Sequence, residues 1–245
     1  MQKTCIVVPC YNEALRLRTD EFVTFARAQE QLLLCLVNDG STDATLAVID
    51  RIVAQLPGRA FCLDLKTNKG KAEAVRLGML HAAQHIPADF LGFWDADLST
   101  PFGELRLLCD GFNRDRPTMA VFGSRVKRLG TDIVRKASRH YLGRVFSTVA
   151  SLVVGLPVYD SQCGAKIFRK EYVVPLFGEP FLTNWLFDVE ILARLRRDYG
   201  VERTTRSIYE APLSKWKEVG GSKLRFTHAL KAPIDLLRIY LAYRP

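Results

Sequence analysis

The pattern of the first half of the chain is set by residues 32–43, Leu32-Leu33-Leu34-Cys35-Leu36-Val37-Asn38-Asp39-Gly40-Ser41-Thr42-Asp43. An uninterrupted apolar run followed by a polar turn is typical of a strand that is buried on both faces. Residues 42–56 come next and repeat their apolar side chains at helical spacing, at Leu46, Ile49, Val53 and Leu56. Strand, polar turn and helix in this order form the repeating unit of a parallel sheet.

The same unit recurs on both sides of this stretch. A second helix is expected over residues 71–84, and Thr100-Pro101 is typical of the start of another. Further buried strands are expected at residues 5–8, 61–65, 90–94 and 119–122. The alternation predicts an α/β fold, with a mainly parallel, doubly wound sheet that carries helices on both faces.

The alternation ends after Gly123. A long basic and amphipathic helix is expected from about Val134 to Val154, then a loop around residues 160–164 and a strand at residues 165–168. The longest apolar run, residues 145–158, is broken by polar residues, glycine and proline, and is shorter than the roughly 20 residues of a membrane-spanning helix. The N-terminus lacks the features of a secretory signal. We therefore expect a protein that is not secreted and does not span a bilayer.

Composition and cysteine usage are those of an intracellular globular protein. The chain has 245 residues, of which 48% are hydrophobic and 25% charged, which excludes disordered, collagenous and coiled-coil classes. None of the six cysteines forms a Cys-x-x-Cys pair or a cluster with zinc-ligand spacing, and four lie in apolar runs. We interpret them as reduced thiols in a cytosolic protein.

The net charge of +9 belongs to the second half of the chain. Residues 1–124 carry 13 basic and 15 acidic side chains, whereas residues 125–245 carry 22 and 11, concentrated in the basic stretches 125–144 and 203–244. Such stretches attract phosphate groups of nucleic acids, lipids or small substrates, although they also serve simply as solvated helix faces. No helix-turn-helix, zinc or RNA-binding signature and no aromatic stacking platform accompanies them, so we expect no nucleic-acid partner.

Polar side chains gather where three of the expected strands end. In open α/β sheets ligands bind at the carboxyl ends of the strands. Five acidic residues are expected at this edge, namely Glu13, Asp39, Asp43, Asp95 and Asp97. Such a cluster is costly unless a cation compensates it, so Asp95 and Asp97 predict a Mg²⁺ or Mn²⁺ ion that bridges a diphosphate. In isolation, Asp-x-Asp is also a common turn sequence.

Two further turns suit a nucleotide. Asp39-Gly40-Ser41 offers hydrogen-bond acceptors for a base or ribose, and equally suits a simple helix entry. Residues 68–71, Asn-Lys-Gly-Lys, precede a helix whose N-terminus, together with Lys71, could meet phosphate, although a solvated turn would look the same.

In this order, the motifs resemble glycosyltransferase family 2, whose members have the GT-A fold. The resemblance runs through residues 8–13, 38–43, 68–71, 95–99 and 123–125. The second half resembles the polyprenyl-phosphate branch of that family, and most of all the dolichyl-phosphate glucosyltransferases, in residues 160–168, 185–190 and 216–223. This implies one Rossmann-like GT-A domain over residues 1–245, with a nucleotide-sugar-binding half at 1–124 and an acceptor-binding half at 125–245 that could carry interfacial helices.

The resemblance assigns roles to residues of the first half. It places the nucleoside against Pro9, Tyr11, Glu13 and Asp39. Asp95 would contact the ribose or sugar beside the metal, and Asp97 would ligate the metal directly. Dolichyl-phosphate mannose synthases have a glutamine two residues after the second aspartate, where this chain has Ser99. This departure argues against a mannose synthase and leaves the third metal ligand open.

The resemblance also implies direct displacement with inversion at the anomeric carbon. A lipid monophosphate, with a second pKa of about 6, is already an anionic nucleophile at neutral pH and needs no general base. The protein must then supply positive charge and alignment. We assign acceptor-phosphate binding to Arg125, aided by Arg135 and Arg139, which share a face if residues 134–154 are helical.

Sugar contacts are assigned to Gln162 and Asp188 by the same resemblance. In isolation, Gln162 could be a turn residue and Asp188 a helix N-cap. Asp97, Arg125 and Asp188 are then the expected catalytic residues. The alternative is a family 2 enzyme that glycosylates a saccharide hydroxyl, with Asp188 as general base. Motifs do not encode sugar choice, but the resemblance favours UDP-glucose and a bacterial undecaprenyl or a dolichyl phosphate.

Residues 223–243 alternate basic with aliphatic and aromatic side chains. This pattern is typical of an interfacial helix and predicts peripheral attachment to an anionic cytoplasmic membrane surface. The same helix could instead pack on the core of the domain.

Overall fold

The computed structural model describes residues 2–134, 137–219 and 226–244, with the side chains of residues 137–141 and 226–230 left out. The chain divides into two compact units, each described here by itself. The first comprises residues 1–98 and 165–180, and the second residues 99–164 and 181–245.

The first unit contains five neighbouring strands in the order β3-β2-β1-β4-β7. β1 pairs in parallel with β2 and β4, β2 pairs in parallel with β3, and β7 is antiparallel to β4. The strand bounds are β1 Thr4–Cys10, β2 Leu32–Asp39, β3 Ala60–Leu65, β4 Phe90–Trp94 and β7 Ala165–Arg169. β1, β2 and β4 are almost wholly buried, as their continuous apolar runs require.

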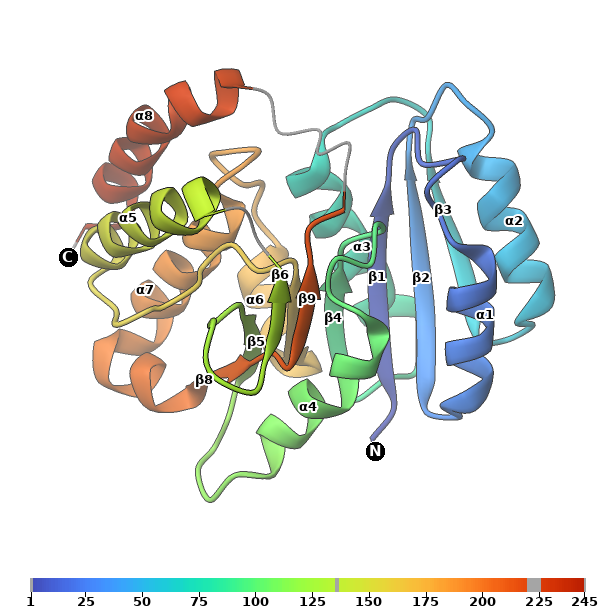
Figure 1. Cartoon of the computed structure of the whole chain (residues 1–245), viewed down its shortest axis with the longest axis horizontal. Helices are drawn as coiled ribbons and strands as arrows, with labels where there is room; N and C mark the ends of the chain where they lie inside the picture. Colours follow the sequence, from blue (N-terminus) through green and yellow to red (C-terminus); the bar gives the residue numbers. More distant parts are fainter. Residues whose placement is uncertain (1, 135–136, 220–225, 245) are drawn as a thin grey trace. The chain divides into compact units, whose positions relative to one another are not determined.

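Helices cover both faces of these strands (Figure 1). α1 and α2 pack against each other and against β2, with α2 also on β3, whereas α3 covers β1, β2 and β4. A side chain at Gly78 of α3 would lie 2.5 Å from Val7 Cγ1 and 2.7 Å from Val37 Cγ2, so α3 approaches the strands closely there. The helices of this unit are α1 Thr19–Ala28, α2 Thr45–Gln55, α3 Lys71–His85 and α6 Val173–Phe177.

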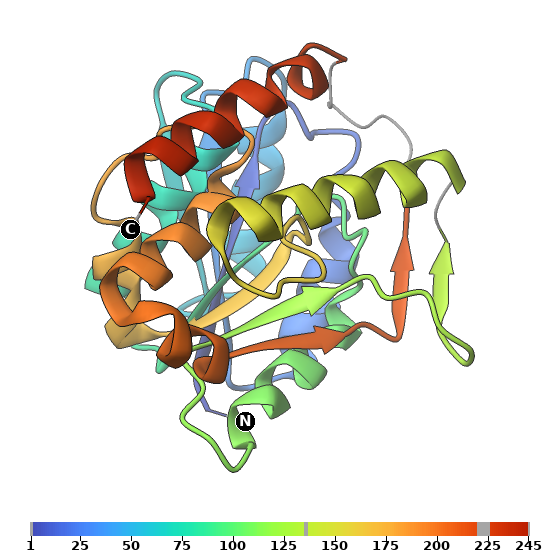
Figure 2. The ribbon, with the colours of Figure 1, turned by 90° about the vertical axis from the view of Figure 1, so that its left-hand side faces the viewer.

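The second unit contains two parallel pairs of strands and a group of long helices (Figure 2). β5 pairs with β8 and β6 with β9. α5, α7 and α8 pack against one another, and α7 bends at Gly200, where φ is +77°. The elements are α4 Leu105–Asp110, β5 Ala120–Ser124, β6 Asp132–Val134, α5 Ala137–Val154, α7 Phe187–Ser207, β8 Ile208–Pro212, β9 Lys215–Lys217 and α8 Phe226–Tyr243.

The predicted α/β class, strands and helices are confirmed, with two differences at element ends. The basic helix begins at Ala137 and not at Val134, because Val134 belongs to β6 and pairs with Lys217 of β9. Thr100-Pro101 leads into a single 3-10 turn, with Pro101 at its N-cap, before the short helix α4.

The six cysteines are free thiols, of which five are buried. Burial raises the pKa of Cys35 to about 12 and that of Cys62 to about 11, so these thiols hold their protons at neutral pH. Within the described ranges, the helices are each too short or too polar to cross a membrane.

Candidate active site

The ends of β1, β2 and β4 in the first unit carry the acidic residues predicted from the sequence. Asp95 follows β4 directly, and a tight turn closes with Leu98 N donating to the Asp95 carbonyl at 3.2 Å. Leu98 has a φ of +51°, so the backbone reverses after Asp97. The side chains of Asp95 and Asp97 are 34% and 24% exposed. The turn therefore lets carboxylates two residues apart both remain accessible.

Each of these two carboxylates is matched by a cation of the same unit. Lys71 Nζ, at the start of α3, forms an ion pair with Asp95 Oδ1. Arg16 lies 3.5 Å from Asp97 Oδ2 and also 3.5 Å from Glu13 Oε2. Sequence reasoning missed Arg16, although its position three residues after Glu13 is the usual spacing of a local ion pair.

Asp39 joins the end of β2 to the loop that precedes α3. Its buried carboxylate accepts hydrogen bonds from Lys69 N at 2.7 Å and from Gly70 N at 3.0 Å. The neighbouring Gly40 has a φ of +60°, and a side chain there would collide with the backbone of Thr67. The loop of residues 68–71 was predicted either to meet phosphate or to be a solvated turn. Its hydrogen bonds to Asp39 attach it to the end of β2 and fix the start of α3.

The loop after β1 is fixed to the turn after β2. Glu13 N donates to Thr45 Oγ1 at 2.7 Å. Asn12, which has a φ of +49°, accepts a hydrogen bond from Thr42 N on its side-chain oxygen at 2.9 Å. Pro9 lies in β1, one residue before its end, and Tyr11 lies in the loop, with its side chain partly open to solvent. The seven residues predicted to bind the nucleotide-sugar or its metal all belong to the first unit and lie at or near the ends of β1, β2 and β4 and the start of α3. They are Pro9, Tyr11, Glu13, Asp39, Lys71, Asp95 and Asp97.

In the second unit, Arg125 follows β5 and is held by Asp160. Its Nε and one terminal nitrogen each lie 2.7 Å from a different carboxylate oxygen, and its backbone N donates to the same carboxylate at 3.0 Å. The Arg125 guanidinium also lies over the Trp216 ring at 5.4 Å. Glu210 of β8 in turn receives the backbone N–H groups of Tyr159 and Asp160. The predicted phosphate ligand is therefore oriented by a buried carboxylate that sequence reasoning missed.

Three buried polar atoms lie beside this ion pair in the sequence. Ser124 Oγ, Ser161 Oγ and Gln162 Nε2 have no hydrogen-bond partner among the described residues. Gln162 N donates to Asp160 at 3.2 Å, so its backbone is fixed by the same carboxylate that holds Arg125. Buried polar atoms are normally paired, so these three atoms are candidates for contact with a bound ligand or water.

Asp188 lies in the first turn of α7 and is 4% exposed. Leu186 occupies the N-cap position, so Asp188 is not the helix cap that its sequence context allowed. A carboxylate in the first turn is stabilised by the helix dipole. Arg135 lies outside the described residues, as does the side chain of Arg139, so their predicted part in phosphate binding stays a prediction.

The two aspartates are the part of the site that fits a divalent cation. Among the residues that the structure describes, no group of three or more His, Cys, Asp or Glu side chains is placed to hold a metal. Asp95 and Asp97 could supply oxygen ligands from one turn, with other coordination positions left for water and phosphate. That donor set is the one Mg²⁺ and Mn²⁺ commonly use with diphosphates.

Comparison with known proteins identifies the family. The family model "Glycosyl transferase family 2" matches residues 5–177. A dolichyl-phosphate beta-glucosyltransferase from Saccharomyces cerevisiae is 30% identical over 260 residues, which cover 97% of this chain and 74% of that protein. The enzyme of the same name from Drosophila melanogaster is 31% identical over 254 residues, covering 97% and 74%.

Solved structures support the fold. Glucosyl-3-phosphoglycerate synthase from Mycobacterium tuberculosis, in a complex with phosphoglyceric acid, has a TM-score of 0.68 at 14% identity and covers 99% of this chain and 80% of its own. A mannosyltransferase from Pyrobaculum calidifontis, in complex with GDP-Man and Mn²⁺, has a TM-score of 0.65 at 19% identity, covering 98% and 63%. The protein is therefore a glycosyltransferase with the GT-A fold that belongs to glycosyl transferase family 2, in the branch that contains the dolichyl-phosphate beta-glucosyltransferases.

Proposed function

We propose that this protein transfers glucose from UDP-glucose to a polyprenyl or dolichyl phosphate, with inversion at the anomeric carbon. The observation that carries the proposal is the similarity over 97% of the chain to enzymes named dolichyl-phosphate beta-glucosyltransferase. A related structure contains UDP-glucose and Mn²⁺, which supports the choice of donor and metal. The residues of the first unit support binding of the nucleotide-sugar donor there, and those of the second unit support binding of the phosphate acceptor.

The first unit suits the donor. Pro9, Tyr11, Glu13 and Asp39 surround the nucleoside in this proposal, and Lys71 faces the diphosphate. A divalent cation held by Asp95 and Asp97 would supply positive charge to the leaving diphosphate. In the structure, Lys71 forms an ion pair with Asp95 and Arg16 forms one with Asp97. Both carboxylates therefore have a positively charged partner within the first unit, which supports their remaining ionised.

The second unit suits a phosphate acceptor. An acceptor phosphate oxygen forms the new bond to the anomeric carbon while the bond from that carbon to UDP breaks, and the electron pair leaves with UDP. Because the phosphate is already ionised at neutral pH, no side chain has to remove a proton. Arg125, oriented by Asp160 and stacked on Trp216, would bind the phosphate, with Arg135 and Arg139 assisting. Gln162 and Asp188 would border the sugar.

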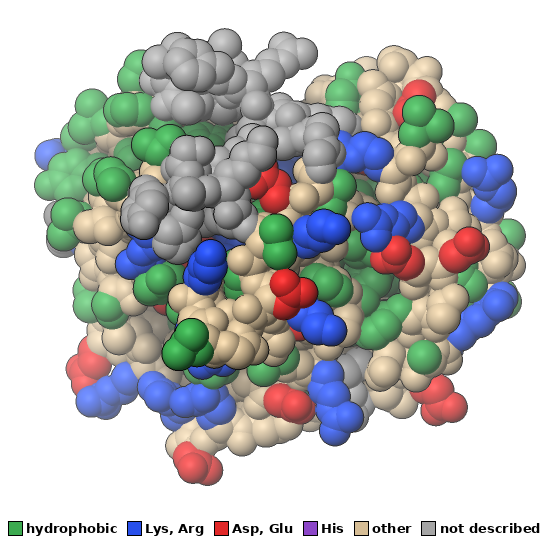
Figure 3. Space-filling view, viewed as in Figure 1, with side chains coloured by type: hydrophobic (Ala, Val, Ile, Leu, Met, Phe, Trp, Pro, Cys, Tyr) green, Lys and Arg blue, Asp and Glu red, His purple; other side chains and the backbone are tan. Residues whose placement is uncertain are grey.

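Two neighbouring helices of the second unit support attachment to a membrane. α5 and α8 run side by side (Figure 2), and α8 buries Ala232, Leu236 and Ile239. Their outer surface, named here the α5–α8 face, exposes aliphatic side chains at helical spacing, Leu142, Val145, Val149 and Leu152 on α5 and Ile234, Leu237 and Leu241 on α8. Hydrophobic side chains also gather over this region in the space-filling view (Figure 3).

The charge around the α5–α8 face favours a lipid surface as its partner. Lys231, Arg238 and Arg244 of the same region are exposed, and monomeric proteins rarely expose large apolar patches without a partner. Apolar side chains rimmed by basic ones are the pattern of a helix that lies in an anionic membrane interface. We therefore propose peripheral attachment to the cytoplasmic surface of a membrane, where a polyprenyl phosphate would be reached.

Vesicle flotation tests the attachment. Vesicles that contain anionic lipid should carry the protein upward, and Leu237→Asp should reduce the bound fraction severalfold. Val174→Asp, which alters an exposed aliphatic side chain of the first unit, is the matched control and should float like the unchanged protein. Equal flotation of both variants, or none with the unchanged protein, would contradict the attachment.

The reaction is tested by a transfer assay with labelled donors. UDP- and GDP-sugars are supplied one at a time with polyprenyl phosphate and Mg²⁺ or Mn²⁺, and the label in the organic phase is counted. The proposal predicts metal-dependent label from UDP-glucose, lost in Asp97→Ala and kept in Asp50→Ala, an exposed acidic residue outside the site. Label that appears only in a water-soluble saccharide would favour the alternative reaction on a hydroxyl, with Asp188 as base.

A further inference from the structure

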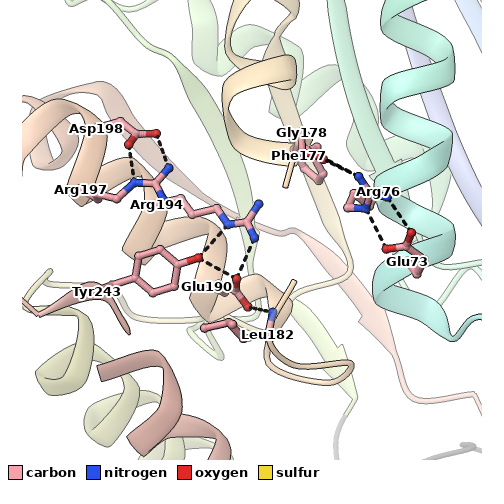
Figure 4. A network of polar contacts seen from close by, with 10 residues as sticks. All are labelled: Glu73, Arg76, Phe177, Gly178, Leu182, Glu190, Arg194, Arg197, Asp198 and Tyr243. Carbon is pink, nitrogen blue, oxygen red and sulfur yellow. Dashed lines mark hydrogen bonds and ion pairs between the residues drawn. The ribbon is translucent and has the colours of Figure 1, made fainter. Parts of the chain in front are cut away.

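The second unit contains a fully buried ion pair that the mechanism does not use (Figure 4). Glu190 and Arg194 of α7 are 0% and 1% exposed, and Arg194 donates to Glu190 Oε1 at 2.8 Å. Tyr243, at the end of α8, donates its hydroxyl hydrogen to the same oxygen at 2.9 Å and accepts from Arg194 Nε at 3.2 Å. Burial and the neighbouring Glu190 carboxylate raise the pKa of Tyr243, so the phenol keeps its proton.

The second oxygen of Glu190 holds the segment that precedes α7. Leu182 N donates to Glu190 Oε2 at 2.8 Å, as Figure 4 shows. The Phe181 ring lies under the Arg194 guanidinium at 4.5 Å and 5.5 Å from the ring of Phe187. One carboxylate thus joins the end of α8 to residues 181–186, and these lead directly to Asp188.

We propose that Glu190 is a positioning residue through which α8 sets the placement of residues 181–186, and with them Asp188, for the transferred sugar. The proposal extends the proposed function and rests on it. α8 carries part of the α5–α8 face on its outer side and Tyr243 on its inner side, so one helix connects the membrane-facing surface to the segment that borders the sugar. Hydrogen bonds to a buried charge are strong, and loss of one partner leaves the other groups incompletely satisfied.

Hydrogen exchange tests the coupling without any need for transfer activity. Tyr243→Phe removes the hydroxyl and leaves the Glu190–Arg194 pair in place. Tyr240→Phe is the matched control, because Tyr240 lies on the same helix and is 46% exposed. Amide exchange in residues 181–186 should become about tenfold faster in Tyr243→Phe, the effect of losing one hydrogen bond to a charged group, and stay unchanged in Tyr240→Phe. Unchanged exchange, equal changes in both variants, or a uniform increase over the whole chain would overturn the coupling.

Steady-state kinetics test the positioning. With polyprenyl phosphate in vesicles, Tyr243→Phe should raise the KM for UDP-glucose about tenfold, because Asp188 borders its sugar in the proposed function. Inhibition by UDP, which carries no sugar, should be unchanged, because the residues assigned to the nucleoside belong to the first unit. A merely structural role would reduce the active fraction, and hence kcat, with the KM for UDP-glucose unchanged, and that result would overturn the positioning role. If the unchanged protein transferred no sugar to lipid, the proposed function would fail, while the exchange result would still decide the coupling.

Discussion

Removal of Asp160 should destabilise the protein strongly, because it leaves a buried cation without its partner. The side chains of Arg125 and Asp160 are 13% and 8% exposed and meet through two contacts of 2.7 Å. Breaking a buried pair at one partner costs about 3–5 kcal/mol. In a chain of this size each kcal/mol lowers Tm by about 2–4 °C, so Asp160→Ala should lower Tm by about 6–20 °C.

Thermal unfolding followed by circular dichroism measures this shift. Asp110→Ala is the control, since it breaks an ion pair in which Arg106 and Asp110 are 88% and 62% exposed and 3.9 Å apart. Such a surface pair contributes about 0–1 kcal/mol, so Tm should fall by less than about 4 °C. UDP binding at 20 °C should be unchanged in both variants, because the donor residues lie in the first unit. Equal Tm changes in the two variants would refute the argument that Asp160 fixes Arg125 through a desolvated contact.

Three further predictions concern packing, pH and the thiols. Gly78→Ala should cost about 1–3 kcal/mol in urea unfolding, because the added carbon would meet Val7 and Val37 at 2.5 and 2.7 Å, and an unchanged midpoint would contradict the close packing of α3. Hydrogen bonds from Arg76 hold the pKa of Glu73 below its ordinary value of 4.5 (Figure 4). This contribution to stability is present above pH 4.5 and disappears as the pH falls through the lowered pKa, so the urea midpoints of Glu73→Gln and the unchanged protein should differ at pH 6 and converge once the pH lies below the lowered pKa. Because burial raises the pKa of Cys35 to about 12, iodoacetamide at pH 8 should leave this thiol unmodified until denaturant is added, and rapid labelling of the folded protein would show that it is open to solvent.

Local patterns sufficed to predict the elements of the fold and the donor side of the site. Continuous apolar runs mark β1, β2 and β4, and polar residues at their ends mark the ligand edge, because both signals depend only on neighbours in the sequence. The turn that keeps Asp95 and Asp97 accessible follows β4 directly. Contacts between residues far apart in the sequence leave no such local pattern and could not be predicted in this way.

The contacts that sequence reasoning missed join residues far apart in the chain. Asp160 is 35 residues from Arg125, and Glu210 is 50 residues from Asp160. No periodicity connects such positions. The pairing of β5 with β8 places the start of the Arg125 segment beside Glu210. The sequence therefore predicted a phosphate ligand at Arg125 without the Asp160 carboxylate that orients its guanidinium in the structure.

The amphipathic pattern of α8 allowed two interpretations, packing on the core or contact with a membrane. The structure shows that Leu236 and Ile239 are buried, while Leu237 and Leu241 on the same helix are more than half exposed. The apolar face of α8 is therefore wider than the part of the helix that packs against the core, and the remainder of that face is exposed. A sequence pattern gives the angular width of an apolar face, but which part of it meets the core depends on the neighbouring helices.

The most direct test of the central claim is a ³¹P NMR spectrum of the reaction of UDP-glucose with polyprenyl phosphate. We predict that the monophosphate signal is replaced by one phosphodiester signal as an equal amount of UDP appears, and that a ¹H spectrum of the product shows the large H1–H2 coupling of β-glucose. An unchanged monophosphate signal while UDP accumulates would contradict the claim that the acceptor is a lipid phosphate. A phosphodiester that carries α-glucose would contradict inversion.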